Sequence, residues 1–288
     1  MIEQPGILSP TSDYMSFFLS VPGMTPISLL AIAILGLLRI APIVSVAPFL
    51  GSKLPGAAKM GLAMVLTIVL LPQMIASSKL NLSFNVAFIG YSLKELLIGS
   101  IFATLASIPF YIVQATGVLI DFQRGSSAMQ TTDPMLQSQV SPIGVLYNYV
   151  LVVIFFTIGG HIYFVDMLMQ SFVIVPVDGF MAESFFSANT PFWMMMMQLL
   201  HQFALLTIQF SAPALVAILM ADLFLGIANR LAPNVQIAFL GMSIKSLLGL
   251  ILLWASWFFV LQQMEGKTIE FYRKLMDALV SFNPSFAH

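Results

Sequence analysis

The chain has 288 residues, of which 59% are hydrophobic and 8% are charged, with a formal net charge of −1 and no cysteine. Soluble globular domains carry about 25% charged residues, so this chain lacks the polar surface that water requires and belongs in a bilayer or inside a larger assembly. The near-neutral charge gives no attraction for nucleic acid, and the absence of cysteine excludes disulfides and thiolate metal sites.

Residues 1–25 are acidic and contain proline. They lack the basic start and apolar run of a cleavable signal peptide, so we predict none. Six apolar segments follow: residues 27–50, 60–76, 84–120, 143–165, 192–228 and 235–262. A spanning helix needs about 20 residues. We therefore predict an all-α integral membrane protein with a single domain over residues 1–288, made of an apolar helical core (26–262) and an amphipathic C-terminal tail (263–288).

The third and fifth segments are too long for one perpendicular crossing. At about 36 residues, each would measure about 54 Å as a helix, against a hydrocarbon core of about 30 Å. Each also contains a proline, Pro109 or Pro213, which removes one helical hydrogen bond and kinks the axis. Three structures are possible for these two segments: broken half-helices, helices that extend beyond the bilayer, and helices packed mainly on protein. All three argue against a simple six-helix bundle.

Lys94, Glu95 and Lys245 lie inside apolar segments, where a charge is costly and is therefore paired or functional. Lys94 and Glu95 are adjacent and point in different directions on a helix, so we expect each to reach another helix or chain. Small residues recur every four positions around these charges, in two sets: Glu95, Gly99, Ala103 and Ser107, and then Gly241, Lys245 and Gly249. Such stripes let helices approach closely, so tight packing around a salt bridge is favoured over a substrate or proton path.

Other charges mark the ends of apolar segments, where snorkelling and pairing explain most such residues. They are Arg39, Asp121, Arg124, Asp222 and Arg230. In both the third and the fifth segment, a proline, an apolar run, an aspartate and an arginine follow in the same order, although the spacing differs.

The sequence contains no catalytic or metal-binding motif. His161 and His201 are isolated, and there is no HExxH, GxSxG or GxGxxG. A protease dyad of Asp121 and Asp222 is disfavoured, because each has an arginine nearby and neither lies in mid-helix. The four methionines of residues 194–197 favour flexible apolar packing over a compliant seal. We predict no enzyme activity, no catalytic residue, no cofactor and no metal.

Residues 117–142 turn polar between two apolar segments. The stretch has small residues at 125–128, and Asp133 followed by Pro134 is a turn signal. These residues alone permit either a linker of low order or a loop with a role of its own.

The tail beyond residue 262 carries balanced charges, and its apolar residues recur at helical spacing. These are Ile269, Tyr272, Leu275, Met276 and Leu279. The pattern predicts an amphipathic helix that lies on a membrane or on a partner, with a helix that caps the chain's own core as the alternative.

Three blocks of the chain carry further motifs in a fixed order. The first contains Arg39, Pro42, Pro48, Pro55, Lys59 and Pro72. The central block includes the string DFQRG and contains Lys94, Glu95, Gly99, Gly117, Asp121, Gln123, Arg124, Gly125, Asp133 and Pro134. The late block contains Asp222, Gly226, Asn229, Arg230, Pro233, Gly241, Lys245 and Gly249. Together they resemble the FliR/SctT/SpaR family, the T component of the export apparatus in bacterial type III secretion systems and flagella.

The resemblance implies a non-enzymatic core subunit that assembles with R-, S- and U-type export components into a closed, helical export gate. The gate would consist of bent helical hairpins, partly above the bilayer plane, at the bacterial inner (cytoplasmic) membrane within the basal body. Its other partners would be secreted proteins in transit and membrane lipid, with no nucleic acid.

The same resemblance implies roles for individual residues. A pore plug loop would contain Gly125, Ser126, Ser127, Ala128, Met129, Asp133 and Pro134. Charges for assembly between subunits would be Arg39, Lys94, Glu95, Asp121, Arg124, Asp222, Arg230 and Lys245. The alternative function is a secondary transporter with a midplane site around Glu95 and Lys245, although the sequence lacks a clear inverted repeat of six-helix size.

Overall fold

A computed structural model describes residues 25–51, 54–78, 82–125, 141–179, 191–231 and 237–281. Every regular element within these ranges is helical, which confirms the all-α prediction. The elements are α2 (Pro26–Val46), η1 (Pro48–Leu50), α3 (Gly56–Ser77), α4 (Val86–Gln123), α6 (Pro142–Thr157), α7 (Gly160–Ile174), α8 (Pro191–Leu231), α9 (Ile237–Ala255) and α10 (Trp257–Ser281).

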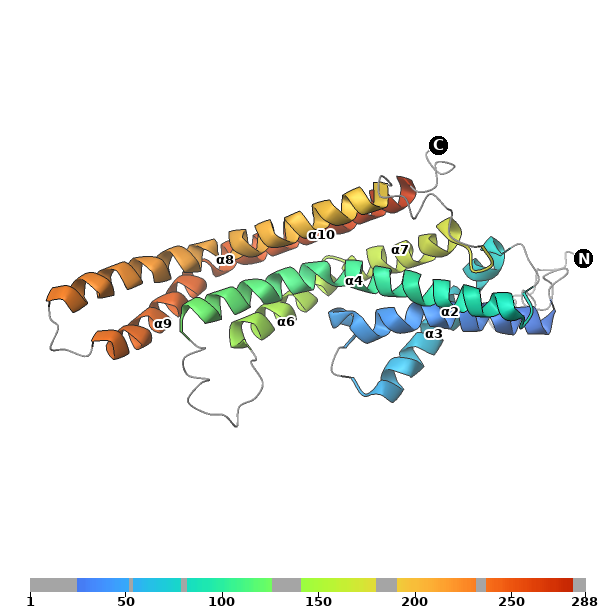
Figure 1. Ribbon diagram of the computed structural model, residues 1–288, viewed down its shortest axis with the longest axis horizontal. Helices are drawn as coiled ribbons and strands as arrows, with labels where there is room; N and C mark the ends of the chain where they lie inside the picture. The colour runs from blue at the N-terminus through green and yellow to red at the C-terminus, as the bar shows by residue number, and fades with distance from the viewer. Residues whose placement is uncertain are drawn as a thin grey trace, which may run out of the picture.

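The molecule is elongated, and the helices α4, α8 and α10 run along its length (Figure 1). At one end, α2 packs beside the N-terminal half of α4, and α3 packs against α2 and α7. Toward the other end, α6 packs beside the C-terminal half of α4, and α8 and α9 form a hairpin that reaches furthest. Helix α4 therefore connects two different surroundings.

The two overlong segments are single continuous helices. Helix α4 has 38 residues and α8 has 41, so they measure about 57 and about 62 Å. Both continue through their internal prolines, Pro109 and Pro213, so broken half-helices are excluded here. Among the described residues, four helices are long and apolar enough to cross a membrane, and up to six spans result if each bent helix pair is one span. This agrees with the six predicted segments and with a membrane protein.

Two other segments are bent, which the prediction of uninterrupted runs over 143–165 and 235–262 missed. Helices α6 and α7 meet at 77°, and α9 and α10 meet at 60°. At the first bend Gly159 has a φ of +75°, a left-handed conformation that glycine adopts without steric cost. No proline marks either bend, because a tight turn between two apolar helices needs only one or two residues.

Helices α2 and α6 begin in the same way. The amide of Ser28 donates to Thr25 Oγ1 at 3.3 Å, and the amide of Gly144 donates to Ser141 Oγ at 2.9 Å. In each helix the residue after the cap is a proline, whose missing N–H would have no partner in the first turn anyway. Cap and proline together fix both starting points.

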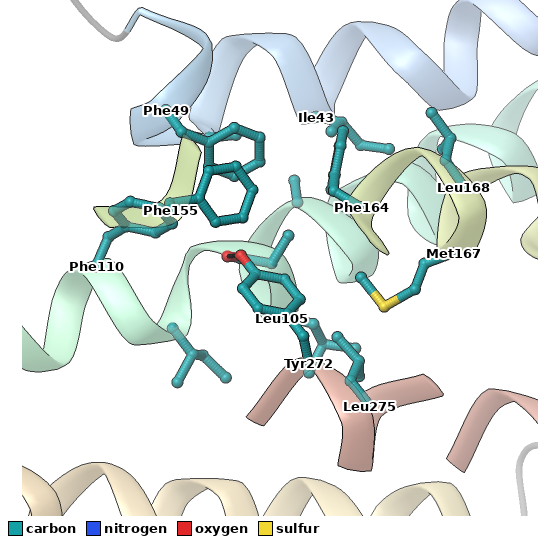
Figure 2. Packing of buried hydrophobic residues seen from close by; sticks show 14 of the residues in the cluster. Ile43, Phe49, Leu105, Phe110, Phe155, Phe164, Met167, Leu168, Tyr272 and Leu275 are labelled. Carbon is teal, nitrogen blue, oxygen red and sulfur yellow. Dashed lines mark hydrogen bonds between the residues drawn. The ribbon is translucent and has the colours of Figure 1, made fainter. Parts of the chain in front are cut away.

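An aromatic cluster joins the elements near the middle of the molecule (Figure 2). The ring of Phe49, from η1, lies 4.6 Å from Phe155, 4.9 Å from Phe164 and 5.3 Å from Phe110, measured between centroids. Phe155 and Phe164 belong to α6 and α7, so η1 fills the inner side of the bend between these helices. Tyr272 of α10 completes the cluster, 5.5 Å from Phe155.

Helix α10 is amphipathic, and its apolar face covers the chain's own core. The buried residues on this face are Val260, Met264, Thr268, Phe271, Tyr272 and Leu275. The opposite face carries an ion pair network in which Glu270 binds Lys267 and Lys274. The structure thus favours the capping helix over a helix whose apolar face lies on a membrane or a partner. The predicted tail is a continuation of α10, because residue 262 lies inside this helix.

The methionine run lies in the first turns of α8 and faces two environments. Met196 packs against the core, whereas Met194 and Met197 are exposed. Of the three side chains of this run whose burial the structure describes, packing within the chain therefore accounts for that of Met196.

Candidate functional site

The charges predicted from the sequence fall into two separate groups on α4. The Arg39 cluster consists of Arg39, Lys94 and Glu95. The α4-end cluster consists of Asp121, Arg124, Asp222 and Lys245. Glu95 and the last described residue after α4, Gly125, are about 45 Å apart at 1.5 Å per residue. Both clusters would fit within about 30 Å of hydrocarbon only if α4 were tilted by about 48° from the membrane normal, which is beyond the range of membrane helices. At least one cluster therefore lies outside the hydrocarbon core.

Arg39 binds Glu95 through two parallel hydrogen bonds, and both side chains are completely buried. Arg39 Nε donates to Glu95 Oε2, and Arg39 Nη2 donates to Glu95 Oε1 at 2.9 Å. The remaining guanidinium donors bind Ser171 Oγ and the carbonyl oxygens of Ser171 and Val175 at the end of α7. All five N–H groups of Arg39 are therefore used. Pairing, one of the two expected explanations, accounts for the charge of Arg39, and snorkelling does not, because the side chain is fully buried.

Lys94 also binds Glu95, which corrects the expectation that these neighbours are poor partners. Lys94 Nζ lies 2.8 Å from Glu95 Oε1. It also donates to the carbonyl oxygens of Pro176 at 2.8 Å and Gly179 at 2.7 Å. The rule that adjacent helical residues diverge applies to their Cβ atoms, whereas the long lysine stem turns back to the carbonyl-rich segment after α7.

The small-residue stripe on α4 brings the Arg39 cluster together. A Cβ atom at Gly99 would collide with the carbonyl oxygen of Arg39. Gly99 is one helical turn from Glu95, so the close approach of α2 and α4 places the guanidinium on the carboxylate. Ala103 and Ser107 continue the stripe and are also fully buried. The predicted role of this stripe in tight helix packing is confirmed.

We expect Gly99→Ala to destabilise the chain strongly, because the new methyl group displaces α2 and separates Arg39 from Glu95. Gly61→Ala is the matched control, because nothing lies within 4 Å of a Cβ atom at Gly61 on α3. Both changes improve helix propensity by about 1 kcal/mol, so their difference isolates the collision. Thermal denaturation in the same detergent is the measurement. Equal melting temperatures for the two variants would contradict the proposed helix contact.

In the α4-end cluster, Asp121 holds the start of α6 against the end of α4. Asp121 Oδ2 accepts a hydrogen bond from Ser141 Oγ at 2.5 Å and one from the amide of Ile143 at 3.0 Å. One turn earlier, a Cβ atom at Gly117 would collide with the backbone of Gly144. The described residues on both sides of 126–140 are thus fixed to each other.

Helix α9 reaches the same place from the other side. Lys245 Nζ lies 3.0 Å from Asp222 Oδ1 on α8. A Cβ atom at Gly125 would lie 3.8 Å from Lys245 Cε, and one at Gly249 would lie 3.1 Å from Arg124 Cγ and Cδ. The second small-residue stripe therefore receives the side chain of Arg124. Gly125 ends α4 with a φ of +84°, in the left-handed conformation that glycine favours.

The remaining predicted residues are not part of either cluster. Arg230 is exposed at the end of α8 and makes no ion pair with any residue that the structure describes. The two aspartates of the disfavoured protease dyad each have other partners, as given above. Of the predicted loop, only Gly125 is described; the others lie outside the described residues: Ser126, Ser127, Ala128, Met129, Asp133 and Pro134.

Sequence reasoning missed several contributors to the two clusters. Ser141 precedes Pro142, and this pair is a recognisable helix-start signal. The carbonyl groups of residues 175–179 that bind Arg39 and Lys94 carry no signal, because every residue type offers the same carbonyl oxygen.

Comparison with known proteins gives the chain its relatives. A family model described as "Bacterial export proteins, family 1" matches residues 30–270. "Yop proteins translocation protein T" of Yersinia pestis is 33% identical over 161 residues, which are 56% of this chain and 60% of that protein's length. "Secretion system apparatus protein SsaT" of Salmonella typhimurium is 30% identical over 80% of this chain and 88% of its own. "Flagellar biosynthetic protein FliR" of Escherichia coli is 24% identical over 75% of this chain and 80% of its own.

Proposed function

This chain belongs to the bacterial export proteins of family 1, and we propose that it is a non-enzymatic core subunit of a type III protein export gate. It is an α-helical membrane protein with a role in the export apparatus. The proposed place is the bacterial inner membrane within the basal body. The proposed task is to form and seal the channel through which unfolded secretion substrates pass.

The contrast between the interior and the exterior of the chain carries this proposal. Inside, the charges are paired with each other or with carbonyl groups. Outside, large apolar residues are exposed along α8, α9 and α10, including Leu223, Phe224, Leu231, Leu247, Trp254 and Phe258. Lipid covers about 30 Å of helix length, and α8 is about twice as long. The rest of this surface needs protein around it, for which we propose the R-, S- and U-type export subunits.

We propose the loop at residues 125–134 as the channel plug. Support comes from its described flanks: Asp121 binds Ser141 and Ile143, and Gly125 lies against Lys245. A flexible linker has no need of ends that are fixed by buried polar contacts. Small and uncharged residues suit a seal, because they pack closely when the channel is shut and offer few contacts to a passing chain.

The proposed assembly role of the eight charges is mainly indirect. Seven of them have partners inside the chain, so they hold the helices whose outer surfaces meet neighbouring subunits. Arg230 is exposed at the end of α8 and is the one we propose for direct contact with another subunit.

A secondary transporter fits the geometry less well. Its midplane site would combine Glu95 and Lys245, but these residues are in clusters about 45 Å apart along α4. Each also has a salt-bridge partner of its own, Arg39 or Asp222. A transport site keeps polar groups available for its substrate, whereas Glu95 is fully buried and already binds two cations.

Purification from native membranes tests the proposed function. We expect the chain to be recovered only in a complex with R- and S-type subunits, because its exposed apolar surface exceeds what one bilayer covers. A stable monomer or dimer that moves a small solute across liposomes would contradict the export gate and support the transporter.

A further inference from the structure

The C-terminal helix α10 touches α4 beside the proline of that helix. Pro109 has no N–H group, so the carbonyl of Leu105 lacks its usual helical partner. The hydroxyl of Ser107 donates to the carbonyl of Ala103 at 2.7 Å, a contact that Ser100, Thr104 and Thr116 also make along α4 with the residue four positions earlier. The lost hydrogen bond at Pro109 is therefore what sets this part of α4 apart, and proline positions are where helices bend.

Tyr272 of α10 donates its hydroxyl to the carbonyl of Ala106, three residues before Pro109, at 2.8 Å. The side chain is almost fully buried, and its ring packs beside Phe155, as Figure 2 shows. This hydrogen bond joins residues 166 positions apart in the sequence. It lies one residue from the carbonyl of Leu105, which Pro109 leaves without its usual helical partner.

The packing has a small gap at the same point. A cavity with room for about one water molecule lies between α4, α8 and α10 and is lined by Pro109, Ile112, Phe210, Thr268 and Phe271, among others. Helix α8 carries its own proline, Pro213, one turn from Phe210. Two proline-containing helices and an unfilled space therefore meet where α10 binds α4. Packed interiors resist motion because they lack such spaces.

We propose that Tyr272 is a conformational latch that fixes the angle of α4 at Pro109. With the hydrogen bond in place, the two halves of α4 keep one orientation. When it is released, α4 bends at Pro109, and a bend of about 10° moves Asp121 by about 3 Å, because 12 residues separate the two positions. Helix α10 thereby controls the position of the α4-end cluster from a distance, independently of what the assembled protein conducts.

Distance measurements between spin labels on α4 and α10 test the latch, and the absence of native cysteine makes every label unique. The full chain in lipid nanodiscs carries cysteines at Val118, on the C-terminal half of α4, and at Phe258 on α10, both of which are exposed. This pair reports the position of the α4 end relative to α10 and not the distance along α4, which a bend of about 10° hardly changes. We expect Tyr272→Phe to raise about fivefold the population of molecules in which α4 is bent, observed as a second distance between the labels. The loss of one net hydrogen bond has an effect of this size. Tyr163→Phe, which removes the hydroxyl of an exposed tyrosine on α7, is the matched control and leaves the distances unchanged.

Two further variants separate a latch from general loosening. A label pair at Val86 and Leu97, both exposed and N-terminal to Pro109, should not respond to Tyr272→Phe. Pro109→Ala restores the missing N–H, so it should narrow the spread of the Val118–Phe258 distance and cancel the effect of Tyr272→Phe. The proposal is overturned if Tyr272→Phe leaves the Val118–Phe258 distance unchanged, if it broadens both label pairs equally, or if Pro109→Ala alone changes nothing.

Discussion

Glu95→Lys is expected to eliminate the folded chain and with it the assembled complex. Among the described residues, the carboxylate of Glu95 is the one acidic group that binds both Arg39 and Lys94. The reversal would place three cations together at a site with no solvent exposure at Glu95. Removing one partner of a buried ion pair already costs about 3–5 kcal/mol, which is comparable to the whole stability of many domains. Size-exclusion profiles and co-purification of the other subunits measure the loss.

Two variants control this result. Glu95→Gln keeps the shape of the side chain but loses the charge, so we expect an intermediate loss of folded protein. Glu265→Lys reverses an exposed carboxylate on α10 and should leave both the chain and the complex intact. If Glu95→Lys assembles normally and only the rate of export changes, the cluster acts in conduction, and its proposed structural role is wrong.

Deletion of residues 126–130 is expected to make the resting membrane leaky to small solutes. These residues follow directly after Gly125, whose position is fixed by the end of α4 and by Lys245. If they form the seal, shortening the loop opens a path while Asp121 still holds α6 against α4. Uptake of a small impermeant dye by cells that express the complex is the measurement.

Replacing residues 126–130 with five other uncharged residues of matching size is the control for this deletion. The replacement keeps the length and size of the loop, so the membrane should stay tight. If the deleted loop leaves the membrane as tight as the intact one while export continues, the segment is a linker.

Composition and periodicity were sufficient to predict the helical membrane fold. Runs of about 20 apolar residues have few alternatives to a spanning helix, because a bilayer cannot satisfy exposed backbone groups. The excess length of the segments that form α4 and α8 was also predictable, since it follows from the number of apolar residues, but their continuity through Pro109 and Pro213 was not. The stripe that begins at Glu95 correctly predicted close helix packing, because small residues at every fourth position admit a neighbouring backbone.

The bends and the composition of the Arg39 cluster could not be predicted in the same way. The turn at Gly159 follows from one glycine in an apolar run, and most glycines in such runs remain helical. Lys94 and Glu95 were expected to diverge. They pair because the Lys94 ammonium binds a carbonyl group after α7 at the place where the Glu95 carboxylate also lies. That placement depends on the bend between α6 and α7, so one missed turn removed the basis for predicting the cluster.

The conductance of the purified complex in a planar bilayer tests the central claim most directly. We predict that the complex with the intact chain is closed to ions at rest and that deletion of residues 126–130 produces stable open channels of uniform conductance. A complex that stays closed after the deletion, or one that conducts equally with the intact loop, would contradict a channel sealed by this chain.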